Sequence, residues 1–326
     1  MTLSIIMYHY VRDLRRSRYP DIKALETDYF RAQIAYIKKY YNVISGEELL
    51  TVIECCEFDA LPPRPLLLTF DDGYIDHYMN VFPILSREKL PGCFFPVAKC
   101  TLENRVLDVN KIHFILASVS DKNIIIEDIF RLIDNNGKLF QTKNRDDYWD
   151  RLAINGRYDS KEIIFIKHLL QRELPEELRL IIVNYLFNKY VTSDEESFAR
   201  ELYMNESQII SMRENGMCIG SHGYSHCWLN AVDPRVRDSE IETAVQFLKR
   251  IGVRTDRWIM CYPHGGYDES LLLVLRNHGC KIGLTTNVGI VDLQRDNYLT
   301  LPRLNTNDLP KQIDALPNEW TRQILM

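Results

Sequence analysis

Short apolar runs alternate along the chain with segments whose apolar residues recur at helical spacing. The runs Ser4–Tyr8, Leu66–Phe70 and Cys93–Val97 are each short and strongly apolar, which predicts buried strands. The pattern over Tyr29–Tyr40 predicts a helix, and a second helix is expected over Ile75–Leu90, where Pro91 and Gly92 end it. Strands and helices therefore alternate over the first hundred residues.

The same alternation resumes after residue 205. Helices are predicted at Glu206–Glu214, Ser239–Ile251 and Glu269–Asn277, and strands at Met217–Gly220, Trp258–Tyr262 and Lys281–Thr285. Short buried strands separated by helices indicate a mostly parallel sheet with crossover helices. The fold class expected from this order is α/β.

The segment from about residue 100 to 205 has a different pattern, rich in helical spacing and poor in strand spacing. Lys161–Gln171 and Glu176–Lys189 are its clearest helices, and Asp134–Lys138 and Gln141–Asp147 are predicted loops. We interpret residues 100–205 as a helical insertion within a single domain that spans residues 1–326. The insertion is expected to form a cap that contributes to substrate choice, and an oligomerisation surface is the alternative.

Composition narrows the class of protein. The 326 residues are 46% hydrophobic and 26% charged with a net charge of -5, which is typical of a soluble globular enzyme and gives no indication of a nucleic-acid partner. There is no secretory signal pattern and no apolar run long enough to span a bilayer, so a cytoplasmic protein is expected. The eight cysteines form no CxxC pair, which argues against a structural zinc cluster.

Two adjacent carboxylates end the second predicted strand. Asp71 and Asp72 stand in the sequence Thr-Phe-Asp-Asp-Gly-Tyr, directly after an apolar run. Burying two like charges side by side is unfavourable unless a cation lies nearby, and ligands bind at the carboxyl ends of parallel strands. The alternative is that the pair caps the following helix.

Two histidines with three residues between them follow another predicted strand. His222 and His226 in Ser-His-Gly-Tyr-Ser-His can converge on one ion, and their position places them at the same end of the sheet as the aspartates. One carboxylate and two imidazoles leave coordination positions open, as a catalytic metal requires. The second carboxylate would then be free to act as a general base.

These two segments resemble the motifs of the NodB-homology polysaccharide deacetylases, carbohydrate esterase family four. The first motif, TFDDG, is present as residues 69–73, and the second, H-[ST]-x-x-H, as residues 222–226 with Gly223 in place of Ser or Thr. The resemblance covers about residues 1–100 and 205–305. It implies a distorted (β/α) barrel, with Asp71 as general base and Asp72, His222 and His226 as metal ligands.

The third family motif, R-x-P-[FY]-G, is altered here. Cys261 stands where the arginine would be and His264 where the aromatic residue would be, so Arg303 is a possible substitute for the arginine that orients the base. The late L-x-H motif is not apparent, which makes His264 the first and His9 the second candidate for general acid. Tyr74, Tyr262, Pro263 and His9 are the expected substrate contacts. We interpret His77, His113, His168 and His278 as structural.

The expected activity is metal-dependent removal of an N-acyl group, usually acetyl, from an amino sugar or glycan. Zn²⁺ is the favoured cofactor, with Co²⁺, Ni²⁺ and Mn²⁺ left open. Asp71 would take a proton from the attacking water, and a backbone N–H near Tyr262 would help to hold the oxyanion. A cytoplasmic location favours a sugar nucleotide, lipid-linked intermediate or short glycan in surface polysaccharide biosynthesis. The alternatives are hydrolysis of N-formyl or non-sugar amides, and a carbohydrate-binding relative without activity.

Overall fold

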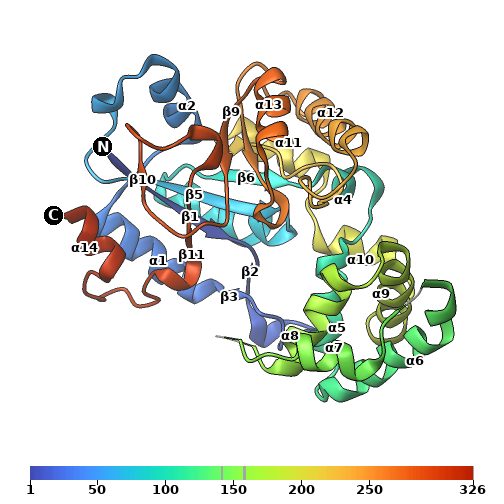
Figure 1. The fold of residues 1–326 in the computed structure, drawn as a ribbon. Coiled ribbons are helices and arrows are strands. Elements are labelled where there is room, and N and C mark those ends of the chain that lie inside the picture. Colours follow the sequence, from blue (N-terminus) through green and yellow to red (C-terminus); the bar gives the residue numbers. More distant parts are fainter. Residues whose placement is uncertain (141, 157–158, 326) are drawn as a thin grey trace. The chain divides into compact units, whose positions relative to one another are not determined.

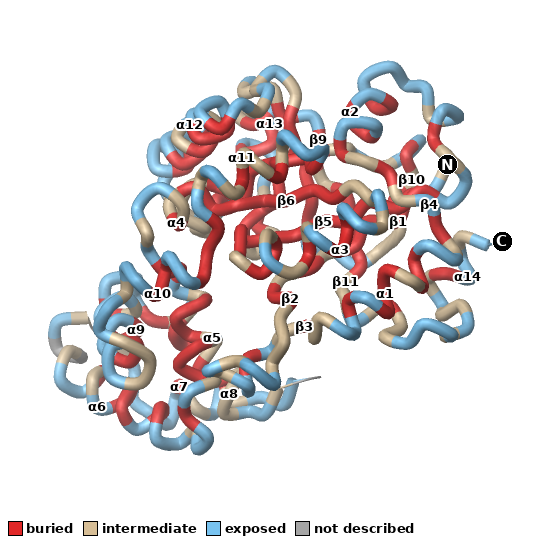
Figure 2. Tube along the Cα trace, turned by 180° about the vertical axis from the view of Figure 1, so that it is seen from behind, coloured by how far each residue is buried: buried red, intermediate tan, exposed pale blue. Residues whose placement is uncertain are grey.

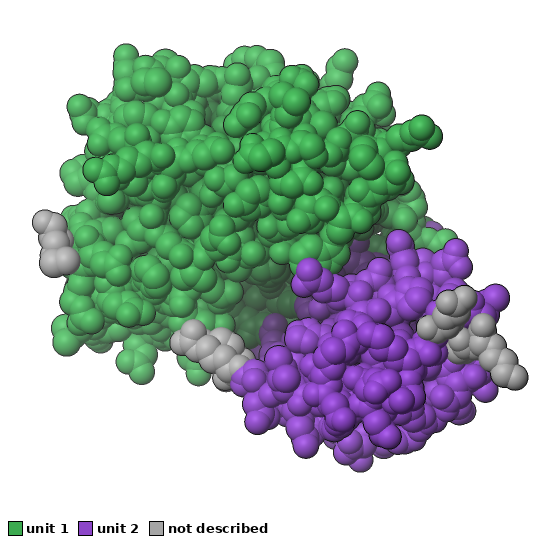
Figure 3. Space-filling model, viewed as in Figure 1, with its two compact units in different colours: residues 1–13, 24–105, 200–326 green, residues 14–23, 106–199 purple. Residues whose placement is uncertain are grey.

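The computed structural model describes residues 1–140, 142–156 and 159–325, with the backbone alone at residues 137 and 138. Within these ranges the chain divides into two compact units, coloured separately in Figure 3. Unit 1 contains Met1–Asp13, Ala24–Arg105 and the chain from Arg200 onward, and unit 2 contains Leu14–Lys23 and Val106–Ala199. None of the helices in the described ranges combines the length and apolar character needed to cross a membrane.

Parallel strands form the centre of unit 1 (Figure 1). The sheet has the order β10-β1-β5-β6-β7, with β11 also paired to β1 and β4 to β5, and within it β10 runs antiparallel to its neighbour. Its strands are β1 (Thr2–Tyr8), β4 (Asn42–Val43), β5 (Pro65–Asp72), β6 (Cys93–Pro96), β7 (Cys218–Ile219), β10 (Val291–Asp292) and β11 (Leu304–Asn305). Two further pairs are formed by β2 (Val11–Arg12) with β3 (Leu25–Glu26), and by β8 (Trp258–Cys261) with β9 (Cys280–Leu284).

Two isolated bridges close these strands into a ring. Ser221, just after β7, pairs in parallel with Met260 of β8, and the Cys261 N–H donates to the Ser221 carbonyl at 2.8 Å. On the other side of the β8–β9 pair, Leu284 pairs with Leu301, three residues before β11. Because β11 pairs with β1, the path β1-β5-β6-β7-β8-β9-β11 returns to its start as a distorted barrel.

The barrel strands are buried because helices cover their outer side. Every residue of β5 is buried, and Figure 2 shows β5 and β6 as continuous buried tubes inside unit 1. Strands buried on both sides read as unbroken apolar runs, which is the pattern of the first motif-bearing strand. The helices of unit 1 are α1 (Thr27–Tyr40), α2 (Gly46–Cys55), α3 (Phe82–Glu88), α4 (Ala98–Glu103), α11 (Glu206–Glu214), α12 (Pro234–Arg250), α13 (Glu269–Asn277) and α14 (Glu319–Leu325).

Unit 2 is helical, and α10 (Glu195–Leu202) continues from it into unit 1. It consists of α5 (Asp108–Ser118), α6 (Lys122–Phe140), α7 (Arg145–Leu152), α8 (Lys161–His168) and α9 (Glu176–Tyr190), together with the segment Leu14–Lys23. Tyr19 anchors that segment, because its ring lies 4.9 Å from Phe114 and 5.9 Å from Phe198 between centroids. The expected insertion at residues 100–205 therefore overlaps unit 2, which also includes a piece of the N-terminal region.

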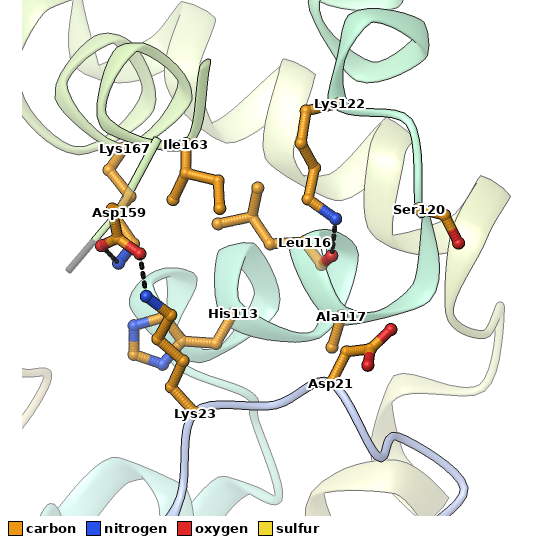
Figure 4. A pocket seen from close by; sticks show the side chains of 10 residues that line it. All are labelled: Asp21, Lys23, His113, Leu116, Ala117, Ser120, Lys122, Asp159, Ile163 and Lys167. Atoms are coloured by element: carbon orange, nitrogen blue, oxygen red, sulfur yellow. Dashed lines mark hydrogen bonds and ion pairs between the residues drawn. The ribbon is translucent and has the colours of Figure 1, made fainter. Parts of the chain in front are cut away.

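A cavity of about 350 Å³ lies within unit 2. Figure 4 shows Leu116 and Ile163 reaching into it, with Lys167 and Lys23 on either side of Asp159. Lys167 Nζ lies 2.8 Å from an Asp159 oxygen, and Lys122 Nζ donates to the Leu116 carbonyl at 2.7 Å. The ammonium groups of Lys167 and Lys122 are thus already paired within the protein.

One prediction of local structure was wrong. Asp134–Lys138 is not a loop, because it lies inside α6, where buried Ile125, Ile129 and Ile133 pack the helix against the rest of unit 2. The helix expected over Ile75–Leu90 is present: the chain is helical from Ile75 to Glu88, through a π-helical segment, His77–Val81, that continues into α3. The predicted loop at Gln141–Asp147 begins at a residue outside the described ranges, and its last three residues belong to α7.

Candidate metal centre

The carboxyl ends of parallel strands bring the sequence motifs to one rim of the barrel. Asp71 and Asp72 are the last two residues of β5, His9 follows β1, and His222 follows the bridge residue Ser221 after β7. Since β1, β5, β6 and β7 run in the same direction, the segments that follow them emerge on the same side. The expected convergence of aspartates and histidines is therefore what the structure shows.

Asp72, His222 and His226 point their ligand atoms at one another. Asp72 Oδ1 lies 3.2 Å from His222 Nε2 and 3.4 Å from His226 Nε2, and the three side chains are nearly inaccessible to solvent. Yet Asp72 Oδ1, although fully buried, makes no hydrogen bond of acceptable geometry to any described residue. A buried carboxylate oxygen without a donor is costly. A cation between the three groups would satisfy it, so these residues fit a divalent metal ion.

Neighbouring groups orient these three side chains. His222 Nδ1 lies 2.8 Å from the Cys261 carbonyl, which requires the proton on Nδ1 and leaves the Nε2 lone pair facing Asp72. The Tyr74 hydroxyl donates to Asp72 Oδ2 at 2.5 Å, which turns the other oxygen toward the histidines. Such partners fix the ligand atoms before any ion arrives.

Asp71 is held by a different partner. The Arg303 guanidinium donates to both of its oxygens, Nη1 to Oδ1 at 2.9 Å and Nη2 to Oδ2 at 2.8 Å. Arg303 is itself fixed, because Nε donates to the Thr285 carbonyl at 2.9 Å and Nη1 lies 3.2 Å from Thr69 Oγ1. Burial alone would raise the pKa of Asp71, but the charge and hydrogen bonds of Arg303, together with the charges of His222 and His9, outweigh burial and lower that pKa to about 2.

His222 also belongs to a second group of residues that could bind a metal ion. Asp71, His222 and Cys261 also bring one carboxylate, one imidazole and one thiol close together. Both oxygens of Asp71 already bind the Arg303 guanidinium, so a metal ion there would face a fixed positive charge. Asp72 instead faces two imidazoles and a tyrosine hydroxyl, and we therefore place the candidate metal centre at Asp72, His222 and His226.

Unusual backbone conformations gather around this centre. Asp72, His226 and His264 all have positive φ angles, of 72°, 64° and 56°, although none is glycine. Such conformations cost about 1–3 kcal/mol each and persist where surrounding contacts hold them. Gly73 also has a positive φ, and a Cβ at that position would lie 2.8 Å from Pro96 Cα, so the TFDDG turn requires its glycine.

The two candidate acids lie in different surroundings. His9 keeps 42% of its side chain exposed and places Nε2 3.9 Å from Asp71 Oδ2, and its carbonyl oxygen accepts from His77 Nε2 at 2.9 Å. His264 instead stacks on Trp228 at 4.6 Å between ring centroids and also contacts the ring of His226. Burial lowers the pKa of His264 to about 3, and the charges of the neighbouring imidazoles add to the effect.

Three of the four expected substrate contacts are buried in the structure, and their role stays a prediction. The rings of Tyr74 and Tyr262 are buried, and the Tyr262 hydroxyl donates to the Leu299 carbonyl at 2.8 Å. Pro263 is buried next to Gly223. The Tyr262 N–H donates to the Leu284 carbonyl, so it is engaged in the barrel and not available to an oxyanion. His9 is the one member of this group with substantial exposure.

Two residues that shape the centre were not singled out from the sequence. Thr69 supports Arg303, and Glu240 on α12 accepts hydrogen bonds from the backbone and the hydroxyl of Ser225. Both effects depend on long-range contacts, and neither residue type stands out from its neighbours. Only the position of Thr69 within the TFDDG motif could have drawn attention to it.

Comparison with known proteins identifies related sequences and folds. A family model described as polysaccharide deacetylase matches residues 59–141 and 184–283, more than half of the chain. YxkH of Bacillus subtilis (strain 168) is 26% identical over 102 residues, which cover 31% of this chain and 36% of that protein. The match thus spans about a third of the length of this curated relative.

Solved structures share the fold over nearly the whole chain. The Streptococcus pyogenes deacetylase PplD, solved with acetate, aligns with a TM-score of 0.58 at 18% identity, covering 100% of this chain and 97% of that one. IcaB from Ammonifex degensii aligns with a TM-score of 0.55 at 16% identity, covering 99% and 96%. The deacetylase domain of BpsB from Bordetella bronchiseptica gives 0.51 at 18% identity, covering 93% and 95%. The expected distorted barrel is thereby confirmed.

Proposed function

Because the chain belongs to the polysaccharide deacetylase family, we propose that it is a metal-dependent hydrolase that removes an N-acyl group, acetyl in the first instance, from an amino sugar or glycan. The observation that carries this proposal is that the two adjacent aspartates have different partners and can therefore have different roles. Asp72 faces two histidines with an unsatisfied oxygen, while Asp71 is ionised and held by Arg303. A hydrolase requires such a general base beside a bound cation. A protein that only binds carbohydrate has no need of this arrangement.

The cofactor that we propose is Zn²⁺, bound by Asp72 Oδ1 and by Nε2 of His222 and His226. Two imidazoles and a carboxylate are also acceptable to Co²⁺, Ni²⁺ and Mn²⁺. When bound there, such a cation would polarise the amide carbonyl and acidify a water molecule. The buried, preoriented ligand atoms support this assignment.

Asp71 is the proposed general base. Each carboxylate oxygen has two acceptor positions, so Asp71 can bind the guanidinium and still accept a proton from water. Its pKa of about 2 ensures that it is ionised at neutral pH, and Arg303 fixes the direction in which its oxygens face. The water oxygen then joins the acyl carbon as its proton passes to Asp71.

His9 is the proposed general acid, in preference to His264. It is half-exposed at the rim, near Asp71, whereas His264 is stacked on Trp228 and meets the ring of His226 edge to face. An N–H of a protonated His9 would pass its proton to the amide nitrogen as the C–N bond breaks, leaving a free amine and a carboxylate. His264 would then shape the wall of the site.

The test of this function is a substrate screen. The Zn²⁺-loaded protein is incubated with N-acetylated sugar nucleotides, N-acetylated oligosaccharides and an N-formylated counterpart, and the products are read by mass spectrometry. Loss of one acetyl group from an amino sugar supports the proposal and names the substrate class. Selective loss of formyl, or no acyl loss from any compound by metal-loaded protein, would contradict it.

A further inference from the structure

The turn between the two histidine ligands has a backbone that needs external support. Gly223 has a φ of 76° and His226 a φ of 64°, so the chain visits the left-handed region twice within four residues. Glycine adopts that conformation freely, but histidine does not. The position of His226 Nε2, 3.4 Å from Asp72 Oδ1, therefore depends on what holds this turn.

One side of the turn is held by backbone groups. The N–H groups of Ala98 and Lys99, in the first turn of α4, donate to the carbonyls of Gly223 and Tyr224 at 3.3 Å and 2.9 Å. Gly223 N–H donates to the Ser221 hydroxyl at 3.1 Å. These contacts fix the first half of the turn and leave the residue before His226 to be held in another way.

The other side is held by one carboxylate. Glu240 Oε2 accepts from the Ser225 N–H at 2.8 Å, and Glu240 Oε1 accepts from the Ser225 hydroxyl at 2.6 Å. Glu240 is only 9% exposed and lies on the buried face of α12, beside Ile241 and Ala244. Burying a carboxylate is unfavourable unless donors compensate it. Ser225 supplies two such donors from the position next to His226.

We propose that Glu240 is a positioning residue for the candidate metal centre. Its two hydrogen bonds to Ser225 hold the strained backbone of His226 and thereby orient His226 Nε2 toward Asp72 and His222. The inference rests on the metal site of the proposed function, and not on the reaction carried out there. The turn has glycine after its first histidine, where the family motif has Ser or Thr. Here the hydroxyl stands at Ser225, where Glu240 can bind it.

Metal affinity is the measurement that tests this role. The Zn²⁺ dissociation constant is determined by competition with a chromogenic chelator, and the Co²⁺-loaded protein gives a visible absorption spectrum that reports ligand geometry. Glu240→Ala removes both acceptors, and we expect the dissociation constant to rise about 10–100-fold, as for other partners that orient metal ligands. Glu240→Gln can still accept from the Ser225 N–H and donate to its hydroxyl, so it should restore most of the affinity.

Two further variants serve as controls. Glu242→Ala changes an exposed residue on the same helix and should leave the affinity and the Co²⁺ spectrum unchanged. Ser225→Ala removes only the hydroxyl bond and should weaken binding less than Glu240→Ala. If Glu240→Ala does not fold, Ser225→Ala decides the question, since an unchanged dissociation constant and spectrum in that variant would overturn the proposal.

The outcomes separate this role from a merely structural one. A Glu240→Ala protein that melts at a lower temperature but binds Zn²⁺ as tightly as wild type would show that Glu240 only stabilises the fold, and the proposal would be wrong. Wild type that binds Zn²⁺ without releasing any acyl group would refute the proposed function and leave this inference standing. Weaker Zn²⁺ binding in Glu240→Ala, with rescue by Glu240→Gln, would support it.

Discussion

Asp71 and Asp72 are neighbours in sequence but differ in what faces their oxygens. Asp71 meets a guanidinium, and Asp72 meets a tyrosine hydroxyl and two imidazoles. The positive φ of Asp72 turns it away from the regular strand, which allows the two side chains to reach different partners. Their substitution should therefore produce different defects.

Asp71→Asn should retain metal and lose turnover. An amide cannot take the proton, and loss of a general base typically lowers the rate by about 10²–10⁴-fold. Asp72→Asn and His226→Ala should lose metal instead. Zinc content per protein and kcat, measured on the same samples, distinguish the two classes. Wild-type turnover in Asp71→Asn would show that the base is another residue.

Arg303→Lys should lower kcat while leaving zinc content and overall structure intact. Lysine keeps the charge but lacks the planar fork that binds both oxygens of Asp71, and a misplacement near 1 Å can cost about 10²-fold in rate. Arg303→Met should also destabilise the folded protein by about 3–5 kcal/mol, because it leaves the buried carboxylate of Asp71 without its partner. Steady-state kinetics and denaturant unfolding measure these effects. A fully active Arg303→Met enzyme would contradict the role of Arg303.

At the scale of elements, local pattern predicted the barrel strands and the motif positions well. Buried parallel strands leave a continuous apolar signature, so Leu66–Phe70 and Trp258–Tyr262 could be located without knowing their partners. The Arg303–Asp71 contact joins residues 232 positions apart and exists only because the ring closes, so family analogy could suggest it but local pattern could not predict it. The recruitment of Leu14–Lys23 into unit 2 depends on Tyr19 meeting Phe114 and Phe198, which leaves no periodic signal.

Helix α6 offers a test of what stabilises unit 2. Asp128 is buried and accepts from Arg131 at 2.8 Å and from Lys189 and Tyr190 on α9. Burial alone would raise the pKa of Asp128, but the hydrogen bonds from Lys189 and Tyr190, together with the charges of Lys189 and Arg131, outweigh burial and hold that pKa below its usual range. The stabilisation is therefore complete above the unfolded-state pKa and is lost as pH falls through the lower folded-state value.

Asp128→Asn should accordingly lower the melting temperature at pH 7. This gap in melting temperature between variant and wild type should narrow below a pH of about 4, near the unfolded-state pKa. Circular dichroism melts at several pH values measure the gap. Asp134→Asn, on the same helix but more than half exposed, is the matched control, and an exposed pair of this kind contributes only about 0–1 kcal/mol. A gap that does not depend on pH would refute the electrostatic explanation.

At the scale of the whole barrel, ring closure between β7 and β8 depends on a glycine. A Cβ on Gly220 would lie 2.5 Å from the Ile259 carbonyl oxygen and 2.5 Å from a ring carbon of Phe95. Because the bridge between Ser221 and Met260 follows immediately, a side chain here would push apart the strands that present His222.

Gly220→Ala should destabilise the protein by about 1–3 kcal/mol, the usual cost of overpacking, and should also weaken Zn²⁺ binding. Gly289→Ala is the control, because its added Cβ would meet Pro302 at an ordinary 3.4 Å. Denaturant unfolding and chelator competition provide the two readouts. Unchanged stability and Zn²⁺ affinity in Gly220→Ala would show that the barrel can close with a wider spacing between β7 and β8.

The central claim is that Asp72, His222 and His226 hold a metal on which amide hydrolysis depends. The most direct measurement follows acetate release from an N-acetylated amino-sugar oligosaccharide by one sample of protein, before chelation, after chelation and after Zn²⁺ is returned. The account predicts release that stops when the metal is removed and recovers when it is restored, with no recovery in His226→Ala. Release that continues unchanged in metal-free protein, or no release from protein shown to contain metal, would contradict it.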